Sequence, residues 1–563
     1  MPISQLNRSQ ARIIRPFAVA FMTLLASLAS SHAAPPQIWF APADWLPRPP
    51  EAPNGLIKYD DYMGLFVPSA PSVMSRVQVL KIFAQTLTWA SDDDLRRIFA
   101  ALKRRNIALA LEIGMVTDTD RCGRGVEGYG GQGVAQLVER IAKLGGELAY
   151  LAMDEPAWYG HNYTGANACR APLADIAGGL AGQVAAVRAI FPKVQIGDGE
   201  PIGSSPDDGL IREYAEWIDT YRQTIGEPLA FFHADVQWEK PWIAPVAELA
   251  ESLKAKAIPF GIIYNGDATD LSDETWIAHA EAHYVAYEAD GRSAPDQVLF
   301  ESWVAHPSHL SPEFDPGAFT YLLRRYFRPR SRIAAELRGE GGSGRLTDDT
   351  GKPLAEVAVN VAGVDEAGRG IPSRVSLPGV VPAKAAEAVI GLRINTECDC
   401  SGNADLSAGT IVYRETKRGA VRYALIPGRN GWQGLGSASG DDPFPFHVRV
   451  AADQPILMNS PVFAVTSGAD FVLDVLWRVS FASQGSGYIT VIFLNQAGKE
   501  IVRTNLPLQP GWAPLGTAKT DNAGKFILAL PREAANFGDL RLRFDGSDRL
   551  RPTEIILQRA RAN

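Results

Sequence analysis

Eight short apolar stretches recur through the first 300 or so residues, and they constrain the fold more than any other feature of the chain. They are QIWFA (37–41), VQVLKIF (77–83), IALALEIG (107–114), LAYLAM (148–153), VQIGD (194–198), LAFFHAD (229–235), FGIIYNG (260–266) and VLFESW (298–303). Short, almost continuously apolar runs rich in β-branched residues are typical of parallel strands that are covered on both faces.

Helical patterns separate most of these stretches. Segment 91–106 begins at Ser91, a suitable N-cap, and has acidic residues in its first turn and basic residues in its last. Similar patterns follow at 133–144, 178–190, 208–222, 244–256, 272–288 and 315–327. The alternation predicts an α/β fold, a (β/α)8 TIM barrel. A doubly wound open sheet is the main alternative, but APADWLP stands where its glycine-rich phosphate turn would follow the first strand.

The N-terminus has the pattern of a secretory signal peptide over residues 1–33. Arg8, Arg12 and Arg15 precede the apolar run 17–29, which is shorter than the ~20 residues that a membrane span needs. We therefore expect a secreted or periplasmic protein without stable membrane insertion. The net charge of −8 becomes more negative when these arginines are removed, so we expect no nucleic-acid partner.

The four cysteines agree with an oxidising compartment. Cys122 and Cys169 lie in predicted loops that follow consecutive strands, and we expect a disulfide between them. Cys398 and Cys400 form a single CxC without a second pair, so we expect no structural zinc.

Acidic residues stand at the ends of most predicted strands. Each follows the previous one after about one βα unit, so all could face the same mouth of a barrel. A single acid at a strand end can also cap a helix or face solvent, but six that converge require either a metal ion or a ligand rich in hydroxyl groups. Repulsion between neighbouring carboxyl groups also moves their pKa values apart, so that one group can stay protonated while another is ionised. The six are Glu112, Glu155, Glu200, Asp235, Asp267 and Glu301.

Aromatic residues near the same strand ends favour a sugar ligand over a metal ion. Aromatic rings beside acids suit the face and the hydroxyl groups of a sugar, whereas a metal site would contain more histidines. We therefore expect no metal and no other cofactor. His233 is interpreted as a hydrogen-bonding residue. The predicted substrate-binding residues are Glu112, Asp154, Tyr159, His233, Asp235, Trp238, Asn265, Asp267 and Trp303.

Two motifs carry a resemblance to a known family. Asp154-Glu155-Pro156, at the end of the predicted fourth strand, resembles the Asn-Glu-Pro motif of a large clan of barrel glycoside hydrolases. Segment 300–303 (FESW) resembles the clan's late-strand nucleophile segment. The resemblance implies that Glu155 is the general acid/base. It also shows two departures: Asp154 replaces an asparagine, and Glu301 ends the eighth strand, whereas the clan's nucleophile ends the seventh.

A second candidate for the catalytic partner comes from segment 198–201, DGEP, which repeats the pattern of an acid pair followed by proline. Proline restricts the residue before it to extended geometry, which would fix the direction of Glu155 and of Glu200. Glycoside hydrolysis needs one protonated and one ionised carboxyl group. The predicted catalytic residues are thus Glu155 with Glu200 or Glu301.

After residue 330 the composition changes to a β type. We expect a glycine-rich linker at 331–345 and a small β-sandwich made of 346–379 and 513–563, because segments 346–354 and 520–526 resemble two parts of a carboxypeptidase-regulatory-like domain. The intervening segment 380–512 resembles a jelly-roll carbohydrate-binding domain. The barrel itself is expected over 34–330.

The pattern as a whole predicts a secreted, monomeric glycoside hydrolase that acts on a polysaccharide or oligosaccharide. A non-catalytic polysaccharide-binding protein on a barrel scaffold is the alternative, and a metal-dependent hydrolase is a more distant one. The predicted loops contain Arg121, Arg124 and Arg170, so an acidic saccharide stays among the possible substrates. We find neither the G-x-S-x-G motif of esterases nor a phosphate-binding loop.

Overall fold

The computed structural model describes most of the chain after the predicted signal peptide. The described residues are 35–46, 57–130, 133–203, 209–238, 242–267, 270, 272–289, 294–338, 341–365, 373–395, 404–415, 419–424, 433–434, 446–450, 456–481, 486–507, 513–530 and 537–558. The predicted signal peptide, Cys398 and Cys400 lie outside these residues.

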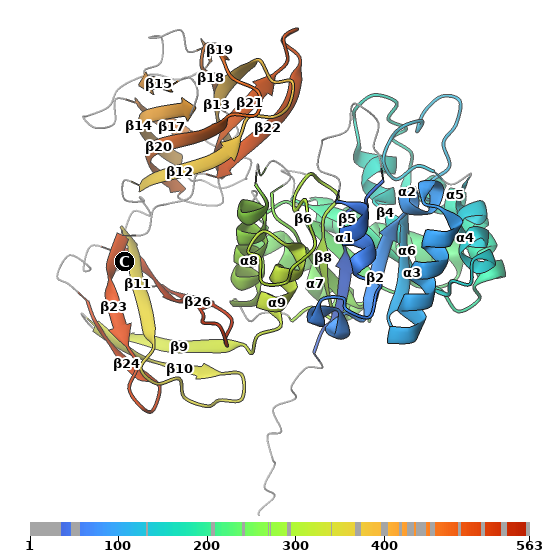
Figure 1. Cartoon of the computed structure of the whole chain (residues 1–563), viewed down its shortest axis with the longest axis horizontal. Coiled ribbons are helices and arrows are strands. Elements are labelled where there is room, and N and C mark those ends of the chain that lie inside the picture. The colour runs from blue at the N-terminus through green and yellow to red at the C-terminus, as the bar shows by residue number, and fades with distance from the viewer. Residues whose placement is uncertain are drawn as a thin grey trace, which may run out of the picture. The chain divides into compact units, whose positions relative to one another are not determined.

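Residues 37–301 form the predicted barrel (Figure 1). Eight parallel strands pair in chain order, and β8 closes the ring on β1. They are β1 (Gln37–Ala41), β2 (Val79–Phe83), β3 (Ala108–Ile113), β4 (Leu148–Asp154), β5 (Gln195–Ile202), β6 (Phe232–Val236), β7 (Phe260–Tyr264) and β8 (Gln297–Glu301). The prediction of a TIM barrel is confirmed, and each strand overlaps one of the eight apolar stretches.

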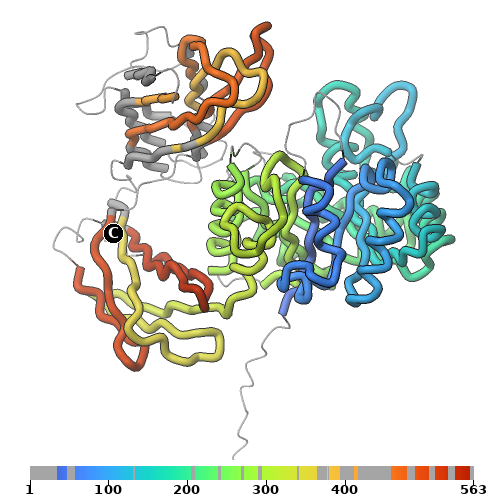
Figure 2. Tube along the Cα trace, viewed as in Figure 1, coloured from blue at the N-terminus to red at the C-terminus, as the bar shows by residue number. Residues whose placement is uncertain are grey.

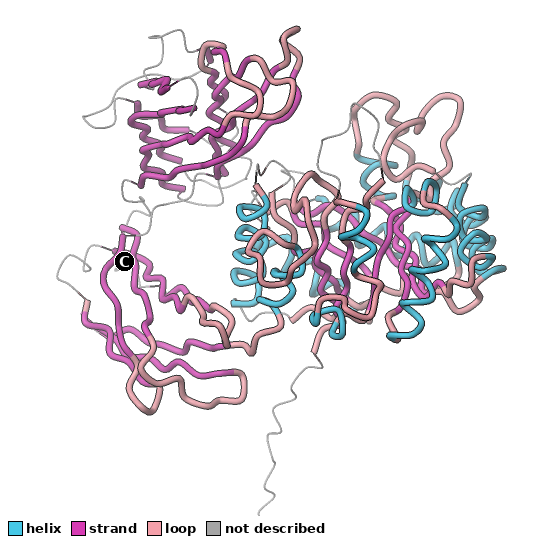
Figure 3. The backbone as a smooth tube through the Cα atoms, in the orientation of Figure 1, coloured by secondary structure: helices cyan, strands magenta, loops and turns pink. Residues whose placement is uncertain are grey.

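Helices surround this ring, as the cyan segments of Figure 3 show. They include all seven predicted helices. The short elements are α1 (Tyr59–Gly64), the 3-10 turn η1 (Ser72–Arg76), α2 (Ala84–Trp89) and the π-helical turn η3 (Trp158–Asn162). The longer helices are α3 (Asp92–Arg105), α4 (Val134–Lys143), α5 (Leu173–Ile190), α6 (Gly209–Ile225), α7 (Ile243–Ala255), α8 (Asp273–Ala289) and α9 (Phe319–Tyr326).

Helix α5 is the one helix in the described part of the chain whose length and apolar composition would allow it to cross a membrane. It is a barrel helix that packs between α4 and α6 and buries Leu180, Val184 and Val187. Its apolar composition is therefore explained by the core that it covers.

Side chains alternate between two cores along each strand because successive residues point to opposite faces. The inner core fills the barrel and consists of Trp39, Val79, Ala110, Ala152, Phe231, Ile263 and Leu299. The outer core lies between the strands and the helices. Residues two positions after an inner-core residue also face inward, which determines what stands at the barrel mouth.

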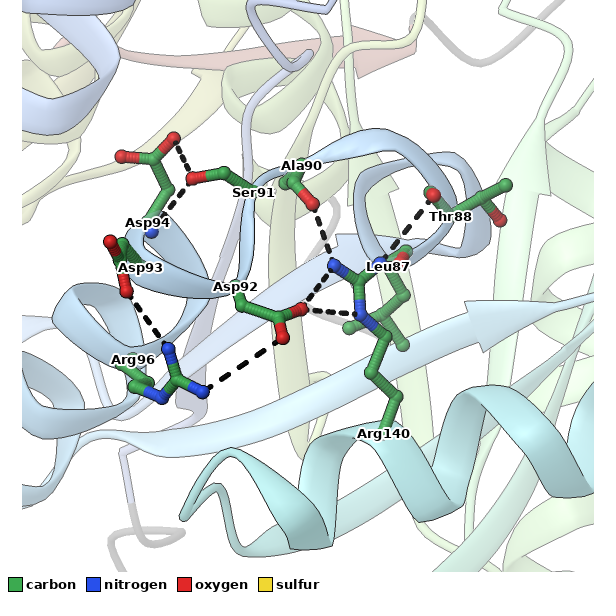
Figure 4. Close-up of polar contacts among 9 residues, drawn as sticks. All are labelled: Leu87, Thr88, Ala90, Ser91, Asp92, Asp93, Asp94, Arg96 and Arg140. Atoms are coloured by element: carbon green, nitrogen blue, oxygen red, sulfur yellow. Dashed lines mark hydrogen bonds and ion pairs between the residues drawn. The ribbon is translucent and has the colours of Figure 1, made fainter.

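Helix α3 shows how the sequence signals act locally (Figure 4). Ser91 caps the helix, since its Oγ accepts a hydrogen bond from Asp94 N at 3.1 Å. Arg140 of α4 donates to Ala90 O at 2.7 Å and to Asp92 Oδ1 at 2.8 Å, and it also contacts Leu87 O. One guanidinium thus fixes the end of α2 and the start of α3, which holds α2 against the barrel.

The C-terminal part contains strands and no helices among its described residues. One three-stranded sheet pairs β10 (Gly341–Asp348) with β9 (Ser331–Arg338) and β24 (Lys525–Ala529). One four-stranded sheet has the order β23 (Ala513–Lys519), β11 (Ala358–Asp365), β25 (Phe537–Phe544) and β26 (Thr553–Gln558). Figure 2 shows yellow and red segments, far apart in sequence, side by side in this domain. Strands β10 and β24, which are far apart in the sequence, thus pair with each other.

Between these two halves of the sandwich the chain forms two further antiparallel sheets. One contains β12 (Ser373–Val380), β14 (Ala404–Glu415), β15 (Gly419–Ala424), β17 (Phe446–Val450) and β20 (Asp470–Phe481). The other contains β13 (Glu387–Asn395), β16 (Gln433–Gly434), β18 (Ile456–Asn459), β19 (Phe463–Ala464), β21 (Ser486–Leu494) and β22 (Glu500–Pro507). Because β12 pairs with β20, the inserted part begins before residue 380. The proposed names of both β domains stay predictions.

The prediction of a linker at 331–345 is wrong. Residues 331–338 form β9 and residues 341–345 lie in β10. The two strands pair, with Ser331 opposite Asp348 at one end and Arg338 opposite Gly341 at the other. The glycines are explained by packing: a Cβ on Gly344 would lie 2.3 Å from Phe526 Cζ. Glycine-rich sequence here reflects a close approach of side chains across two strands and not a flexible connection.

We therefore predict that Gly344→Ala lowers the free energy of unfolding of the small sandwich. The added methyl group meets the Phe526 ring and Ala335 Cβ, and overpacking of this kind costs about 1–3 kcal/mol. Ser343→Ala, at the neighbouring exposed position, is the control and should be nearly neutral. Thermal and urea unfolding measure both. Equal stabilities for the two variants would contradict the strand assignment.

Candidate active site

A cavity of about 800 Å³ opens at the carboxyl ends of the barrel strands. This volume is within the range of pockets that bind small molecules. Its described wall combines acidic, aromatic and glycine residues from most of the strand ends and from the loop after β3. The acidic residues that line it are Asp44, Glu112, Glu127, Asp154, Glu155, Asp235 and Glu301. The aromatic residues are Phe83, Trp89, Tyr129, Trp158, Tyr159 and Trp303.

The alternation of the strands explains most of the acidic layer. Glu112 stands two residues after Ala110, Asp154 two after Ala152, and Glu301 two after Leu299, all of which belong to the inner core. Asp235 is four residues after inner-core Phe231. These carboxyl groups are therefore the uppermost inward positions of their strands.

Lys81 belongs to the same inward layer, two residues after Val79 on β2. Its side chain is 1% exposed, and its Nζ lies 2.6 Å from Glu301 Oε2 and contacts Glu112 Oε2. Burial lowers the pKa of the Lys81 ammonium, but Glu112 and then Glu301 outweigh burial, so the pKa is raised overall. Lys81 therefore stays charged. Through its two ion pairs it connects β2 to β3 and to β8.

Glu301 is almost fully buried, and its environment contains opposing influences. Burial raises its pKa, the Lys81 ammonium lowers it, and Glu112 raises it, with the net result of a pKa of about 8. Without Lys81 the same site would hold Glu301 still more firmly in its neutral form.

Glu155 has a different environment. Burial raises its pKa well above the ordinary value, and the carboxyl groups of Asp235, Asp154, Glu127 and Glu200 raise it further. Burial and Glu112 likewise raise the pKa of Asp154. These surroundings favour the neutral form of Glu155.

The backbone at Glu155 departs from the extended geometry that we expected before a proline. Its φ is +46°, in the left-handed region that non-glycine residues seldom occupy. An extended strand would send Asp154 and Glu155 to opposite faces, whereas the left-handed turn lets both line the cavity. The backbone is held there because Glu155 N donates to Gly199 O at 3.0 Å and Tyr159 N donates to Glu155 O at 3.0 Å.

Glu200 fixes the turn that follows Glu155 and does not line the cavity. Its Oε1 accepts a hydrogen bond from Ala157 N at 2.6 Å, and its Oε2 accepts one from Trp158 N at 2.9 Å. The side chain is fully buried on the outward side of β5, in phase with Ile196 and Ile202 of the outer core. The structure gives Glu200 a positioning role, and Gly199 and Pro201 face the cavity in its place.

The loop after β3 forms one wall of the cavity. A disulfide joins Cys122 to Cys169, as predicted, and links this loop to the segment after β4. The loop lies against the end of β4 so closely that a Cβ on Gly128 would be 2.9 Å from Asp154 O. Glu127, the neighbouring residue, is exposed on the cavity wall and raises the pKa of Tyr159, after burial, through a side-chain hydrogen bond.

Seven of the predicted site residues line the cavity: Glu112, Asp154, Glu155, Tyr159, Asp235, Glu301 and Trp303. Besides Glu200, the predicted residues that do not line it are His233, Trp238, Asn265 and Asp267. His233 lies in the barrel interior, shares a hydrogen bond with Gln297, and has a pKa lowered by burial to about 3. Trp238 donates to Asn265 Oδ1 at 2.8 Å and stacks on His283. Asp267 N donates to Asp270 Oδ2.

Sequence reasoning missed Lys81 and Glu127. Lys81 could have been found, because a lysine in phase with the inward residues of an apolar strand points into the barrel. Glu127 lies in a loop, where no periodicity exists to place it.

The similarities that this chain shows to known proteins are structural and weak. No family model and no curated protein sequence matches it. Among solved structures, BuGH86 in complex with neoagarooctaose is 11% identical, with a TM-score of 0.33 and coverage of 80% of this chain and 96% of that one. A glucosidase from Croceicoccus marinus is 10% identical, with a TM-score of 0.32 and coverage of 78% and 96%.

An α-L-arabinofuranosidase from Thermotoga maritima, in its arabinose complex, is 9% identical, with a TM-score of 0.32 and coverage of 78% and 96%. At these TM-scores the likenesses carry no argument about activity. Any assignment of function to this chain therefore depends on its own residues.

We predict that Glu155→Gln stabilises the folded protein at pH 8 and has little effect near pH 4.5. A carboxyl group with a raised pKa keeps its proton in the folded state while the unfolded chain has lost it, so the stability of the wild type falls as pH rises above 4.5. Glutamine removes this penalty, so the variant should be more stable than the wild type at pH 8. Urea unfolding at both pH values measures it.

The control for this experiment is Glu139→Gln, at an exposed position on α4. It should leave the dependence of stability on pH unchanged. If Glu155→Gln destabilised the protein equally at both pH values, the carboxyl group would not be held neutral by its surroundings.

Proposed function

We propose that the protein is a glycoside hydrolase in which Glu155 is the general acid/base and Glu301 is the second catalytic carboxyl group. The observation that carries the proposal is the unequal treatment of two carboxyl groups in one cavity. Lys81 lies 2.6 Å from Glu301 and favours its ionised form, whereas four carboxyl groups surround Glu155 and favour its protonated form. Glycoside hydrolysis requires one protonated and one ionised carboxyl group. Because the pKa of Glu301 is about 8, Glu301 would supply the carboxylate as the pH approaches that value, while Glu155 keeps its proton.

The reaction would proceed in the following way. Glu155 transfers its proton to the glycosidic oxygen while the bond from that oxygen to the anomeric carbon breaks. The Glu301 carboxylate then either bonds to the anomeric carbon or removes a proton from the water that attacks it. In the first case, water later releases the sugar from Glu301, and Glu155 accepts the proton of that water. The anomer formed first, observed by proton NMR, distinguishes the two routes.

The remaining residues of the cavity would bind and orient the sugar. Trp89, Trp158 and Trp303 provide flat apolar surfaces for sugar rings, and Asp154 and Asp235 provide acceptors for hydroxyl groups. Glu200 would act through the backbone that it fixes, and Lys81 through Glu301. Both are positioning residues in this scheme. The disulfide suits the secreted or periplasmic location that we expect.

We predict that Glu155→Gln and Glu301→Gln each lower the release of reducing ends by about 100-fold or more, as expected for the loss of a catalytic carboxyl group. The experiment uses residues 34–563 and a panel of neutral, acidic and amine-bearing polysaccharides. Glu200→Gln should lose less activity than either, because it touches the backbone at residues 157–158 and not the substrate.

Glu139→Gln serves again as the matched control and should keep full activity. If the wild type bound a polysaccharide without cutting any member of the panel, the protein would be a carbohydrate-binding protein on a barrel scaffold. If Glu200→Gln were as inactive as Glu155→Gln while Glu301→Gln were active, the partner carboxyl group would be misassigned.

A further inference from the structure

We propose that the α2–α4 corner of the cavity, formed by Gln85, Trp89 and Leu137, is a separate subsite for one unit of an extended saccharide, remote from the unit whose bond is cleaved. Arg140 positions this subsite through the backbone of α2. The inference rests on the proposed function for the identity of the ligand as a sugar. It goes beyond that function because it makes chain length the property by which the protein selects its substrate.

The cavity extends outward beyond the strand ends. Its wall includes Gln85 and Trp89 of α2 and Leu137 of α4, whereas Glu155 and Glu301 stand at the ends of β4 and β8. Helix α2 begins directly after β2 and packs against α4, so it leads from the mouth toward the ring of helices. Its last residue, Trp89, lies roughly 8 Å along the helix from its first. A sugar ring in the corner is therefore a different unit from the one that reacts.

Helix α2 has a buried face and a face toward the cavity. Thr86 and Leu87 are buried, whereas Gln85 and Trp89 are exposed and line the cavity. Residues four positions apart lie on the same side of a helix, so these two side chains are neighbours on the cavity face. Trp89 is 51% exposed, and the other tryptophans that the structure describes are buried or half-buried. The chain thus presents a large apolar ring to the cavity instead of burying it.

The chemistry of the corner suits a sugar unit without charge. An indole ring packs on the apolar C–H face of a sugar, and the Gln85 amide can both donate to and accept from its hydroxyl groups. The three side chains of the corner carry no charge. Other large exposed apolar side chains in the described part of the chain lie outside the cavity wall: Tyr59, Ile243, Phe314, Val380, Val462, Ile501, Ile527 and Ile556.

Arg140 of α4 fixes the C-terminal end of α2 (Figure 4). The last carbonyl groups of a helix have no partner within the helix, and one guanidinium supplies a partner here. Arg140 donates to Ala90 O at 2.7 Å and to Thr88 O at 3.4 Å, and it also contacts Leu87 O. These carbonyl groups stand before and after Trp89 in the sequence. Arg140 therefore determines where the indole ring stands, although Arg140 does not line the cavity.

The other side of α2 is held by the segment after β1. Thr86 Oγ1 donates to Asp44 Oδ2 at 3.0 Å, and both side chains are buried. A helix of six residues is not stable by itself in water, so these outside contacts decide its position. A binding surface that is fixed before the ligand arrives loses less freedom when the ligand binds.

The test measures affinity against chain length for residues 34–563 with Glu155→Gln. The probes are β-1,4-linked oligomers of two to eight units of glucose, xylose, mannose, galactose and N-acetylglucosamine, followed by isothermal titration calorimetry. We expect the affinity for at least one series to rise with length. Adding Trp89→Ala should weaken binding of the octamer about tenfold, the loss expected for one aromatic contact, and should weaken binding of the shortest bound oligomer much less.

Two variants control for the loss of the ring. Trp89→Phe keeps an aromatic ring at the position and should retain most of the affinity for the octamer. Phe314→Ala removes a ring that is 67% exposed but lies outside the cavity wall, and it should leave the affinities at every length unchanged.

Arg140 is tested through KM and kcat on the chain that keeps Glu155. Arg140→Met should raise KM for the octamer several-fold more than it lowers kcat, and Arg140→Lys, which can still donate to the carbonyl groups, should recover part of the loss. Lys143→Met, at an exposed position on the same helix, is the control. Equal losses on short and long oligomers would remove Arg140 from the proposal.

Binding and cleavage are measured separately, so the two ideas fail separately. The proposal is overturned if no series binds, or if Trp89→Ala affects short and long oligomers equally. Cleavage with a KM that does not depend on Trp89 at any length would leave the proposed function standing and remove this inference. Length-dependent binding through Trp89, by a chain that keeps Glu155 and cleaves no oligomer, would do the reverse.

Discussion

The ion pairs of Lys81 with Glu112 and Glu301 are the interaction on which the mouth of this barrel depends. A buried ammonium without partners costs several kcal/mol, and so does a buried carboxylate, but the two can be buried together. Strand β2 supplies the ammonium, and β3 and β8 supply the carboxylates. The pairing lets an inward layer of acids exist above an apolar interior that contains Trp39 and Phe231. It also sets Glu301 apart from Glu155, whose pKa is raised by burial and by four neighbouring carboxyl groups.

A second constraint acts on Glu155. The residue occupies a left-handed backbone conformation, which costs of order 1 kcal/mol or more for a glutamate, and the surrounding structure must compensate for it. Two sets of hydrogen bonds provide that compensation: Gly199 O accepts one from Glu155 N, and the Glu200 carboxyl group accepts one each from the backbone N–H groups of residues 157 and 158. The two segments in which acids precede a proline thus have different roles. After β4, the segment places the Glu155 carboxyl group at the cavity, whereas on β5 the Glu200 carboxyl group fixes the backbone beside Glu155.

Much of the barrel could be predicted from the sequence because strands that are buried on both faces consist of short, almost continuously apolar runs. The site was predictable to the extent that strand periodicity applies. Glu112, Asp154 and Glu301 are in phase with the inner core, and the same rule, applied to Ile196 and Ile202, would have placed Glu200 on the outward face. The periodicity gave no information on Glu127, since a disulfide-linked loop and its contact with the backbone of residue 154 bring it to the cavity. The glycines at 341–344 were misread because glycine signals close packing as well as flexibility.

The central claim is that the two catalytic carboxyl groups differ in their readiness to lose a proton. It can be tested directly by carbon-13 NMR of glutamate side chains, with Glu155→Gln and Glu301→Gln used to assign the two signals. The account predicts that, as pH rises from about 4 to 9, Glu301 loses its proton before Glu155 does. Ionisation of Glu155 near pH 4.5, or before Glu301, would contradict it.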